Sequence, residues 1–166
     1  MSKVEIERKF LVNTRLFQET FPGIVGEKID QGYLGNGVRI RLSTYTSRRF
    51  VSKDLGWITI KGKATDAAQT TRVEYEYEIP WQDAREILEM CSEGRVIKTR
   101  FKVDHKGHMW DVDSFDGWHV GLWLAEIELS SPDEPFEMPP WVTTEVTADK
   151  RFSNANLAKA KGPPTL

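Results

Sequence analysis

The stretch RVEYEYEI, residues 72–79, alternates charged and apolar side chains without a break. Successive side chains of a β-strand point to opposite faces, so this alternation predicts a strand with one charged and one apolar face. The charged face carries Arg72, Glu74, Glu76 and Glu78. Because long charged residues are poor strand formers, a strand that gives a whole face to them calls for a functional or structural reason.

The same alternation recurs in further segments along the chain. Each segment places charged residues on one strand face: Glu5, Glu7 and Lys9; Arg39 and Arg41; Lys61 and Lys63; Lys98, Arg100 and Lys102; Asp111 and Asp113; Glu126 and Glu128. One such strand alone is usually the solvated side of a sheet. The whole set instead indicates a concave or closed sheet whose charged faces converge, and a barrel of about eight strands can enclose one small ligand.

The remaining pattern predicts an antiparallel sheet of about eight or nine strands, because the connecting loops are short and polar. The strand candidates are residues 4–12, 29–34, 37–46, 49–54, 57–63, 71–79, 96–104, 109–115 and 122–130, of which adjacent pieces can fuse. Three helices are predicted: 14–21 with Thr14 as cap, 81–93 with Gly94 as stop, and 153–161 with Ser153 as cap.

Length and composition predict one soluble domain over residues 1–162, followed by a frayed tail at 163–166. The formal net charge of −2 gives no global basic signal for nucleic acid or an anionic membrane. The single cysteine, Cys91, excludes an internal disulfide, and no segment resembles a signal peptide or a membrane span. We therefore expect a cytoplasmic protein that binds neither nucleic acid nor membrane.

The two signs of charge in one interior point to a particular class of ligand. Converging arginines and lysines need an anion, and converging carboxylates need a cation. A polyphosphate with a divalent metal ion supplies both charges. Arginines in the set suit bidentate phosphate contacts, whereas lysines act as point charges.

At this level of detail the chain resembles the CYTH-domain proteins, the triphosphate tunnel metalloenzymes. The resemblance begins at EIERK (5–9), which matches the ExExK signature. It continues in order through QGYL (31–34), VRIR (38–41), ITIKGK (58–63), RVEYEYEI (72–79), KTR (98–100), DVDSF (111–115), AEIEL (125–129) and EVTADKRFSN (145–154). It is strongest to the small bacterial proteins that hydrolyse inorganic triphosphate, and it covers nearly the whole chain.

The resemblance implies an α+β fold, mainly antiparallel β, in which a closed eight-stranded barrel forms a tunnel with a few helices packed outside. It implies that Mg²⁺ or Mn²⁺ is held by acidic residues, with Asp113, Glu126 and Glu128 as first choice and Glu5 and Glu7 as further ligands. The expected phosphate-binding residues are Lys9, Arg39, Arg41, Lys61, Lys63, Arg72, Arg100 and Lys150. A homodimer is a family-level expectation.

Lys98 is the candidate for orienting or deprotonating the attacking water. An ordinary lysine has a pKa near 10.4 and is a poor base. Crowding by Arg100 would lower that pKa, whereas nearby carboxylates would raise it, and the sequence does not decide between them.

The leading functional hypothesis is metal-dependent hydrolysis of inorganic triphosphate to diphosphate and phosphate. Thiamine triphosphate hydrolysis and ATP chemistry, either hydrolysis or cyclisation by a class IV-type adenylate cyclase, are alternatives because one phosphate cradle serves all of these organic triphosphates. A non-catalytic module that binds polyphosphate or a nucleotide is the alternative from another class, although such a module would have less need of the carboxylates. No function is predicted for the polar run at residues 46–54.

Overall fold

The structure is a computed structural model that describes residues 3–35, 37–47, 50–63 and 71–165. Within these ranges the side chains of residues 3–5, 46–47, 50–52 and 71 are left out of the description. No helix in the described part of the chain is long and apolar enough to cross a membrane.

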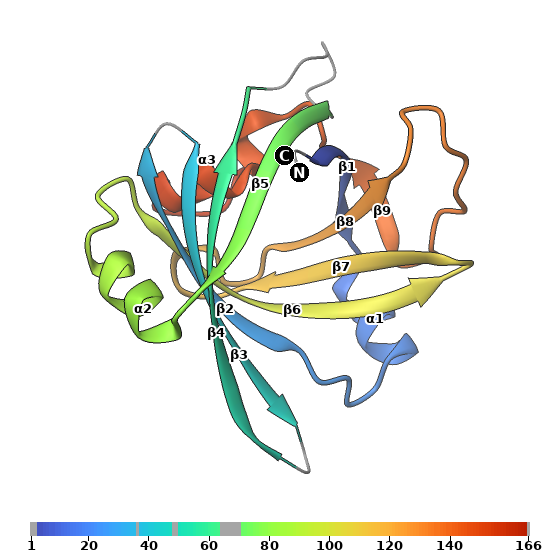
Figure 1. Ribbon diagram of the computed structural model, residues 1–166. Coiled ribbons are helices and arrows are strands. Elements are labelled where there is room, and N and C mark those ends of the chain that lie inside the picture. Colours follow the sequence, from blue (N-terminus) through green and yellow to red (C-terminus); the bar gives the residue numbers. More distant parts are fainter. Residues whose placement is uncertain (1–2, 36, 48–49, 64–70, 166) are drawn as a thin grey trace.

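The described strands form one antiparallel sheet that comes round on itself (Figure 1). Its order is β5-β4-β3-β2-β6-β7-β8-β1-β9, and the start of β1 also pairs with β5 through Lys3–Ile6 and Thr71–Glu74. This second pairing brings the ends of the row together around a central cavity. The strands are β1 (Lys3–Val12), β2 (Glu27–Gly35), β3 (Val38–Ser47), β4 (Phe50–Lys61), β5 (Thr71–Ile79), β6 (Arg95–His105), β7 (His108–Phe115), β8 (Trp123–Leu129) and β9 (Val142–Glu145).

The predicted antiparallel barrel with helices outside is confirmed, with differences in detail. The candidates at 49–54 and 57–63 fuse into the single strand β4, which pairs with β3 along nearly its whole length. The short strand β9 is absent from the predicted set. It pairs with β1 beyond the stretch that β5 covers, through Phe10 and Val12.

Helices α1 and α2 pack on the outside of the barrel and α3 lies at one end of it. The helix ends differ from the prediction. Helix α1 (Thr14–Thr20) is capped by Asn13, not Thr14, because the Asn13 side chain accepts a hydrogen bond from the amide of Leu16 at 3.1 Å. Helix α2 (Trp81–Glu89) ends four residues earlier than predicted, and Gly94 instead takes a positive φ of 96° in the turn before β6. Helix α3 (Asn154–Lys159) has the predicted Ser153 cap.

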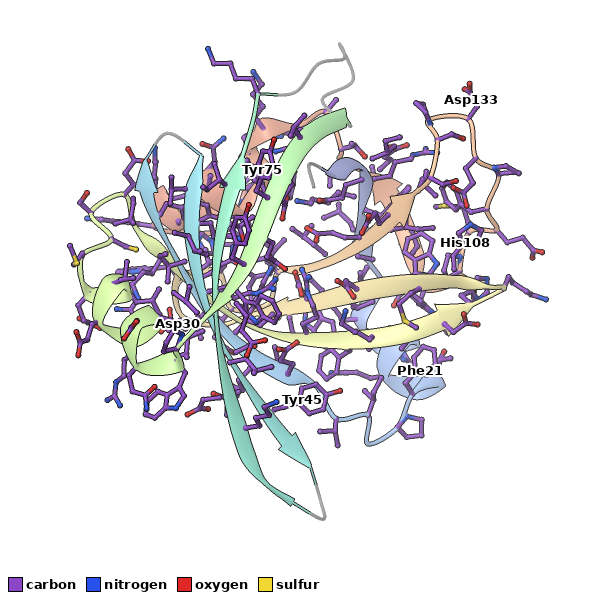
Figure 2. All side chains as sticks on the ribbon, viewed as in Figure 1. Phe21, Asp30, Tyr45, Tyr75, His108 and Asp133 are labelled. Atoms are coloured by element: carbon purple, nitrogen blue, oxygen red, sulfur yellow. The ribbon has the colours of Figure 1, made fainter. Side chains whose placement is uncertain are left out.

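Apolar side chains pack on both outer sides of the barrel. Phe17 of α1 packs against Phe101 and Trp123 on the outer face of β6 and β8, and Phe21 ends this helix in the same cluster (Figure 2). On the other side α2 covers β3 and β4 with Ala84 and Leu88 (Figure 1). These clusters bury many outward strand positions, although some outward side chains such as Tyr77 stay exposed. The charged positions of the same strands face inward.

A third apolar cluster fills one end of the barrel interior. Val96, Phe115 and Leu124 share the inward parity of the charged residues on β6, β7 and β8, and they are buried. Phe152 and Leu157 reach them from the C-terminal segment, which contains the short 3-10 helix η2 (Lys150–Phe152) and α3. The interior is consequently apolar at this end and charged along the rest of its length.

Candidate active site

A cavity of about 880 Å³ opens inside the sheet and is lined by charged side chains of both signs. The inward faces of the strands supply most of the lining, and the turn before β6 and the start of α3 complete it. Its basic residues are Lys9, Arg39, Arg41, Lys61, Arg72, Arg100 and Lys102, and its acidic residues are Glu7, Glu74, Glu76, Glu93, Asp111, Glu126 and Glu128.

Six of the eight predicted phosphate-binding residues meet at this cavity: Lys9, Arg39, Arg41, Lys61, Arg72 and Arg100. Lys150 lines a smaller adjoining pocket of about 200 Å³. Glu7, Lys9 and Arg72 border both spaces, so this pocket is continuous with the main wall. Lys63 is exposed and lies outside both linings.

The cations of the cavity wall are held by carboxylates on neighbouring strands. Arg100 donates to both oxygens of Asp113 at 2.7 Å, and it also contacts Asp111 at 2.7 Å and Glu126 at 3.1 Å. Lys9 lies 2.9 Å from Glu126 and 3.6 Å from Glu7. Burial opposes the charge of Lys9, but Glu126 and Glu7 outweigh it and raise its pKa. A phosphate that bound to these cations would have to exchange partners with the carboxylates.

Lys98 lies behind the cavity wall, in the zone where the charged interior meets the apolar end. Its side chain is 1% exposed, and its Nζ lies 2.6 Å from Asp113 and 3.2 Å from Asn154 Oδ1. Burial lowers the pKa of Lys98 to about 8, although Asp113 acts in the opposite direction. Lys98 is not a lining residue, but its neighbours Asn154 and Arg100 are, so its amine lies directly behind the cavity wall.

The predicted metal ligands divide into two groups. Glu7, Glu126 and Glu128 line the cavity, whereas Asp113 is fully buried behind it and accepts hydrogen bonds on both oxygens. Arg100 and Lys98 hold the pKa of Asp113 below its ordinary value in spite of burial. Asp113 can reach a metal only if one of these bonds opens. The side chain of Glu5 is outside the described residues.

The lining carboxylates fit a hard divalent cation by their chemistry. Glu7 and Glu128 are direct cross-strand partners on β1 and β8, where two like charges repel unless a cation lies between them. Oxygen donors of this kind are the ligands that Mg²⁺ and Mn²⁺ prefer. Among the described residues, no three acidic, histidine or cysteine side chains already enclose a metal position, so binding requires these carboxylates to turn toward the ion.

Asp111 and Tyr33 line the cavity, although neither was among the predicted site residues. Asp111 contacts Arg100 and lies 3.5 Å from Lys102, and its parity with Asp113 was the available signal. The hydroxyl of Tyr33 accepts a hydrogen bond from the Gln31 side chain at 2.8 Å, which leaves its own proton free to point into the cavity. Burial raises the pKa of Tyr33 to about 12. A search for alternating charge overlooks such a neutral donor.

Comparison with known proteins identifies the family. The model of the CYTH domain matches residues 3–160. This chain belongs to the CYTH domain family. It is 39% identical to an inorganic triphosphatase of Acetivibrio thermocellus over 160 residues, which span 93% of each protein. It is 35% identical to an inorganic triphosphatase of Nitrosomonas europaea over 163 residues, which span 93% of this chain and 96% of that protein.

A solved structure places this CYTH chain in the same fold. A crystal structure of an inorganic triphosphatase superposes with a TM-score of 0.61 and 31% sequence identity. The superposition covers 95% of this chain and 96% of the other. The CYTH fold therefore extends over nearly the whole chain and includes every strand that lines the cavity.

Adjacent residues of β1 should respond to mutation in opposite ways. Lys9 lines the cavity, whereas Arg8 points outward, donates to Glu145 and lies over the ring of Phe136. We expect Lys9→Ala to lower kcat/KM for tripolyphosphate about 100-fold, because a buried cation of the cavity wall is lost. We expect Arg8→Ala to keep kcat/KM within about twofold, because exposed ion pairs contribute little. Steady-state kinetics and thermal denaturation of both variants test this, and equal losses of activity would contradict the assignment of faces.

Proposed function

We propose that this protein hydrolyses inorganic triphosphate to diphosphate and phosphate inside the charged cavity, with a divalent metal ion. The observation that carries the proposal is the convergence of guanidinium and ammonium groups with carboxylates in one cavity. The two CYTH relatives named above are inorganic triphosphatases, and both match over more than nine-tenths of this chain. Their names support the same activity here.

The phosphate chain is bound by the cations of the wall. Arg39 and Arg41 on β3, Arg72 on β5 and Arg100 on β6 present forked donors from different sides of the cavity. Lys9 and Lys61 add point charges, Lys150 approaches from the adjoining pocket, and Lys63 acts at the outer margin. Because triphosphate is highly charged, contacts from several strands bind it more strongly than they bind its shorter products.

The metal ion, Mg²⁺ or Mn²⁺, would be held by Glu7, Glu126 and Glu128 on the cavity wall, with Glu5 and Asp113 as the remaining proposed ligands. When bound, such an ion would supply positive charge that offsets the negative charge of the phosphates. The pairing of Glu126 with Lys9 and Arg100 keeps its pKa well below the ordinary value, so this ligand is ionised. Glu126 then also fixes two phosphate-binding cations next to the metal.

Lys98 orients or deprotonates the attacking water. Asp113 and Asn154 fix the position of its amine, and the lowered pKa leaves a larger neutral fraction near pH 8 than an ordinary lysine would have. The Tyr33 hydroxyl, which points into the same cavity, donates to a phosphate oxygen. The reaction then needs only positioning and charge neutralisation, as is general for phosphoryl transfer.

A substrate comparison tests the preference for inorganic triphosphate. Purified protein is incubated with tripolyphosphate, thiamine triphosphate or ATP, each with Mg²⁺ or Mn²⁺, and phosphate release and cyclic nucleotide formation are measured. We expect tripolyphosphate to have the highest kcat/KM, because a wall of charged groups recognises phosphates and not an organic group. Equal turnover of ATP, or preferred turnover of thiamine triphosphate, would contradict the assigned substrate.

A further inference from the structure

Glu76 on β5 makes contacts like those of a phosphate group bound between two arginines. Its Oε1 lies 3.1 Å from Nη2 of Arg41, and its Oε2 lies 3.2 Å from Nη2 of Arg39. Its Oε2 also accepts a hydrogen bond from the Thr59 hydroxyl at 2.8 Å. Guanidinium groups recognise carboxylate and phosphate by the same donor geometry. One carboxylate therefore occupies donors that a phosphate would use.

The strand register builds this arrangement into the sheet. Glu76 is the direct partner of Thr59 across β5 and β4, and Thr59 is the direct partner of Arg39 across β4 and β3. The three side chains thus form one row on the inward face. Arg41 follows Arg39 by two residues and so lies on the same face. The strand register therefore places Glu76 within reach of both arginines.

The Glu76 side chain is exposed enough to move away from the two arginines. Its side chain is 32% exposed, whereas the neighbouring Glu74 is 7% exposed and is held by Lys61 and Arg39. Burial raises the pKa of Glu76, but Arg41 and the Thr59 hydroxyl outweigh that effect and lower it overall. Glu76 is therefore an anion at neutral pH that can turn out to water when another anion arrives.

We propose that Glu76 is a built-in competitor for the anion subsite formed by Arg39 and Arg41. This inference rests on the proposed function, because it assumes that phosphates bind these two arginines. A phosphate group gains the Nη2 donors of Arg39 and Arg41 when the Glu76 carboxylate leaves them. Glu76 therefore weakens the binding of substrate and product alike, and it favours release of diphosphate after cleavage by returning to the arginines.

Binding of polyphosphate to a Glu76→Gln variant tests the proposal. Glutamine keeps the size of the side chain and can still accept from Thr59, but it loses the charge that holds the arginines. Titration calorimetry with tripolyphosphate and with diphosphate is performed in EDTA, so that neither turnover nor metal ligation contributes. We expect both ligands to bind Glu76→Gln about tenfold more tightly than they bind the wild type. Product inhibition by diphosphate should strengthen in parallel during metal-supported turnover.

Glu78→Gln is the matched control. Glu78 lies on the same strand and inward face, its loss changes the net charge equally, and it is exposed and not a lining residue of the cavity. We expect its affinities to stay within about twofold of the wild type. Equal tightening in Glu78→Gln would show a general charge effect and would overturn the proposal.

Other outcomes also decide the matter. Unchanged or weaker binding by Glu76→Gln would mean that Glu76 supports the arginines and does not compete with phosphate. If that variant folds poorly, Glu76→Asp keeps the charge but shortens its reach, and tripolyphosphate in EDTA should raise its Tm more than that of the wild type. An equal Tm rise would contradict the inference. If the wild type cleaves tripolyphosphate but Glu76→Gln does not bind it more tightly, only this inference is wrong. If the wild type neither binds nor cleaves tripolyphosphate, the proposed function is wrong as well.

Discussion

Lys98→Ala should lower kcat for tripolyphosphate by about 100-fold or more, the range of effects of general acid–base groups. The amine lies 2.6 Å from Asp113 and at the border of the cavity, and its lowered pKa suits proton transfer better than that of an ordinary lysine. Arg100 still holds both oxygens of Asp113 in this variant, so the acidic partner does not become unpaired. Substrate affinity in EDTA and metal affinity should therefore change far less than turnover.

Two further variants test whether the loss of turnover is due to the missing Lys98 amine. Lys98→Met fills the buried space and should show the same loss of turnover, which separates the missing amine from a cavity left by alanine. Lys28→Ala removes a lysine whose side chain is 66% exposed on β2, and its kinetics should match the wild type. Unchanged turnover in both Lys98 variants would remove Lys98 from the reaction.

Glu126→Gln should lower kcat for tripolyphosphate about 100-fold, measured at a metal concentration that saturates the wild type. Glu126 is the carboxylate that adjoins the proposed metal and also holds Lys9 and Arg100. Its replacement by an amide removes a charged oxygen ligand and loosens two cations of the phosphate cradle. The measurement is a titration with Mg²⁺ and with Mn²⁺, in which the midpoint should shift to higher concentration.

The control for Glu126 is Glu137→Gln, an exposed carboxylate in the loop between β8 and β9. This control should keep both the wild-type rate and the wild-type metal midpoint. A Glu126→Gln variant with a normal metal midpoint and a lower rate would assign Glu126 to the phosphate cradle alone and would contradict its role as ligand.

Residue parity was sufficient to predict which side chains face inward. The alternation in RVEYEYEI put Glu74 and Glu76 on the cavity wall, and the alternation in EIERK put Glu7 and Lys9 there. These predictions succeed because a strand has a period of two whatever its neighbours are. The same rule does not give the position of an inward residue along the barrel axis.

Lys98 illustrates that limit. It shares the inward parity of Arg100, yet it lies behind the wall because Val96 and Phe115 fill the interior at this end with help from the C-terminal segment. How far this apolar cluster reaches depends on contacts between residues that are far apart in the sequence. The pairing of Arg100 with Asp113 and of Glu76 with two arginines depends likewise on strand register, which composition and spacing do not reveal.

Local signals also failed where tertiary contacts decided the outcome. Thr14 and Asn13 are both good N-cap residues, and helix α1 is capped by Asn13. The backbone N–H of Asn13 also donates a hydrogen bond to the carbonyl of Trp141. The short strand β9 has only four residues and becomes a strand because β1 offers it a free edge beyond β5.

The most direct test of the account is metal-dependent cleavage of tripolyphosphate by the purified wild-type protein. Phosphate and diphosphate are measured after incubation with Mg²⁺ or Mn²⁺, with EDTA, and with EDTA followed by excess metal. We predict equal amounts of the two products with metal, none with EDTA, and restored cleavage when the metal is returned. Absence of metal-dependent release, or release that persists undiminished in EDTA, would contradict the account.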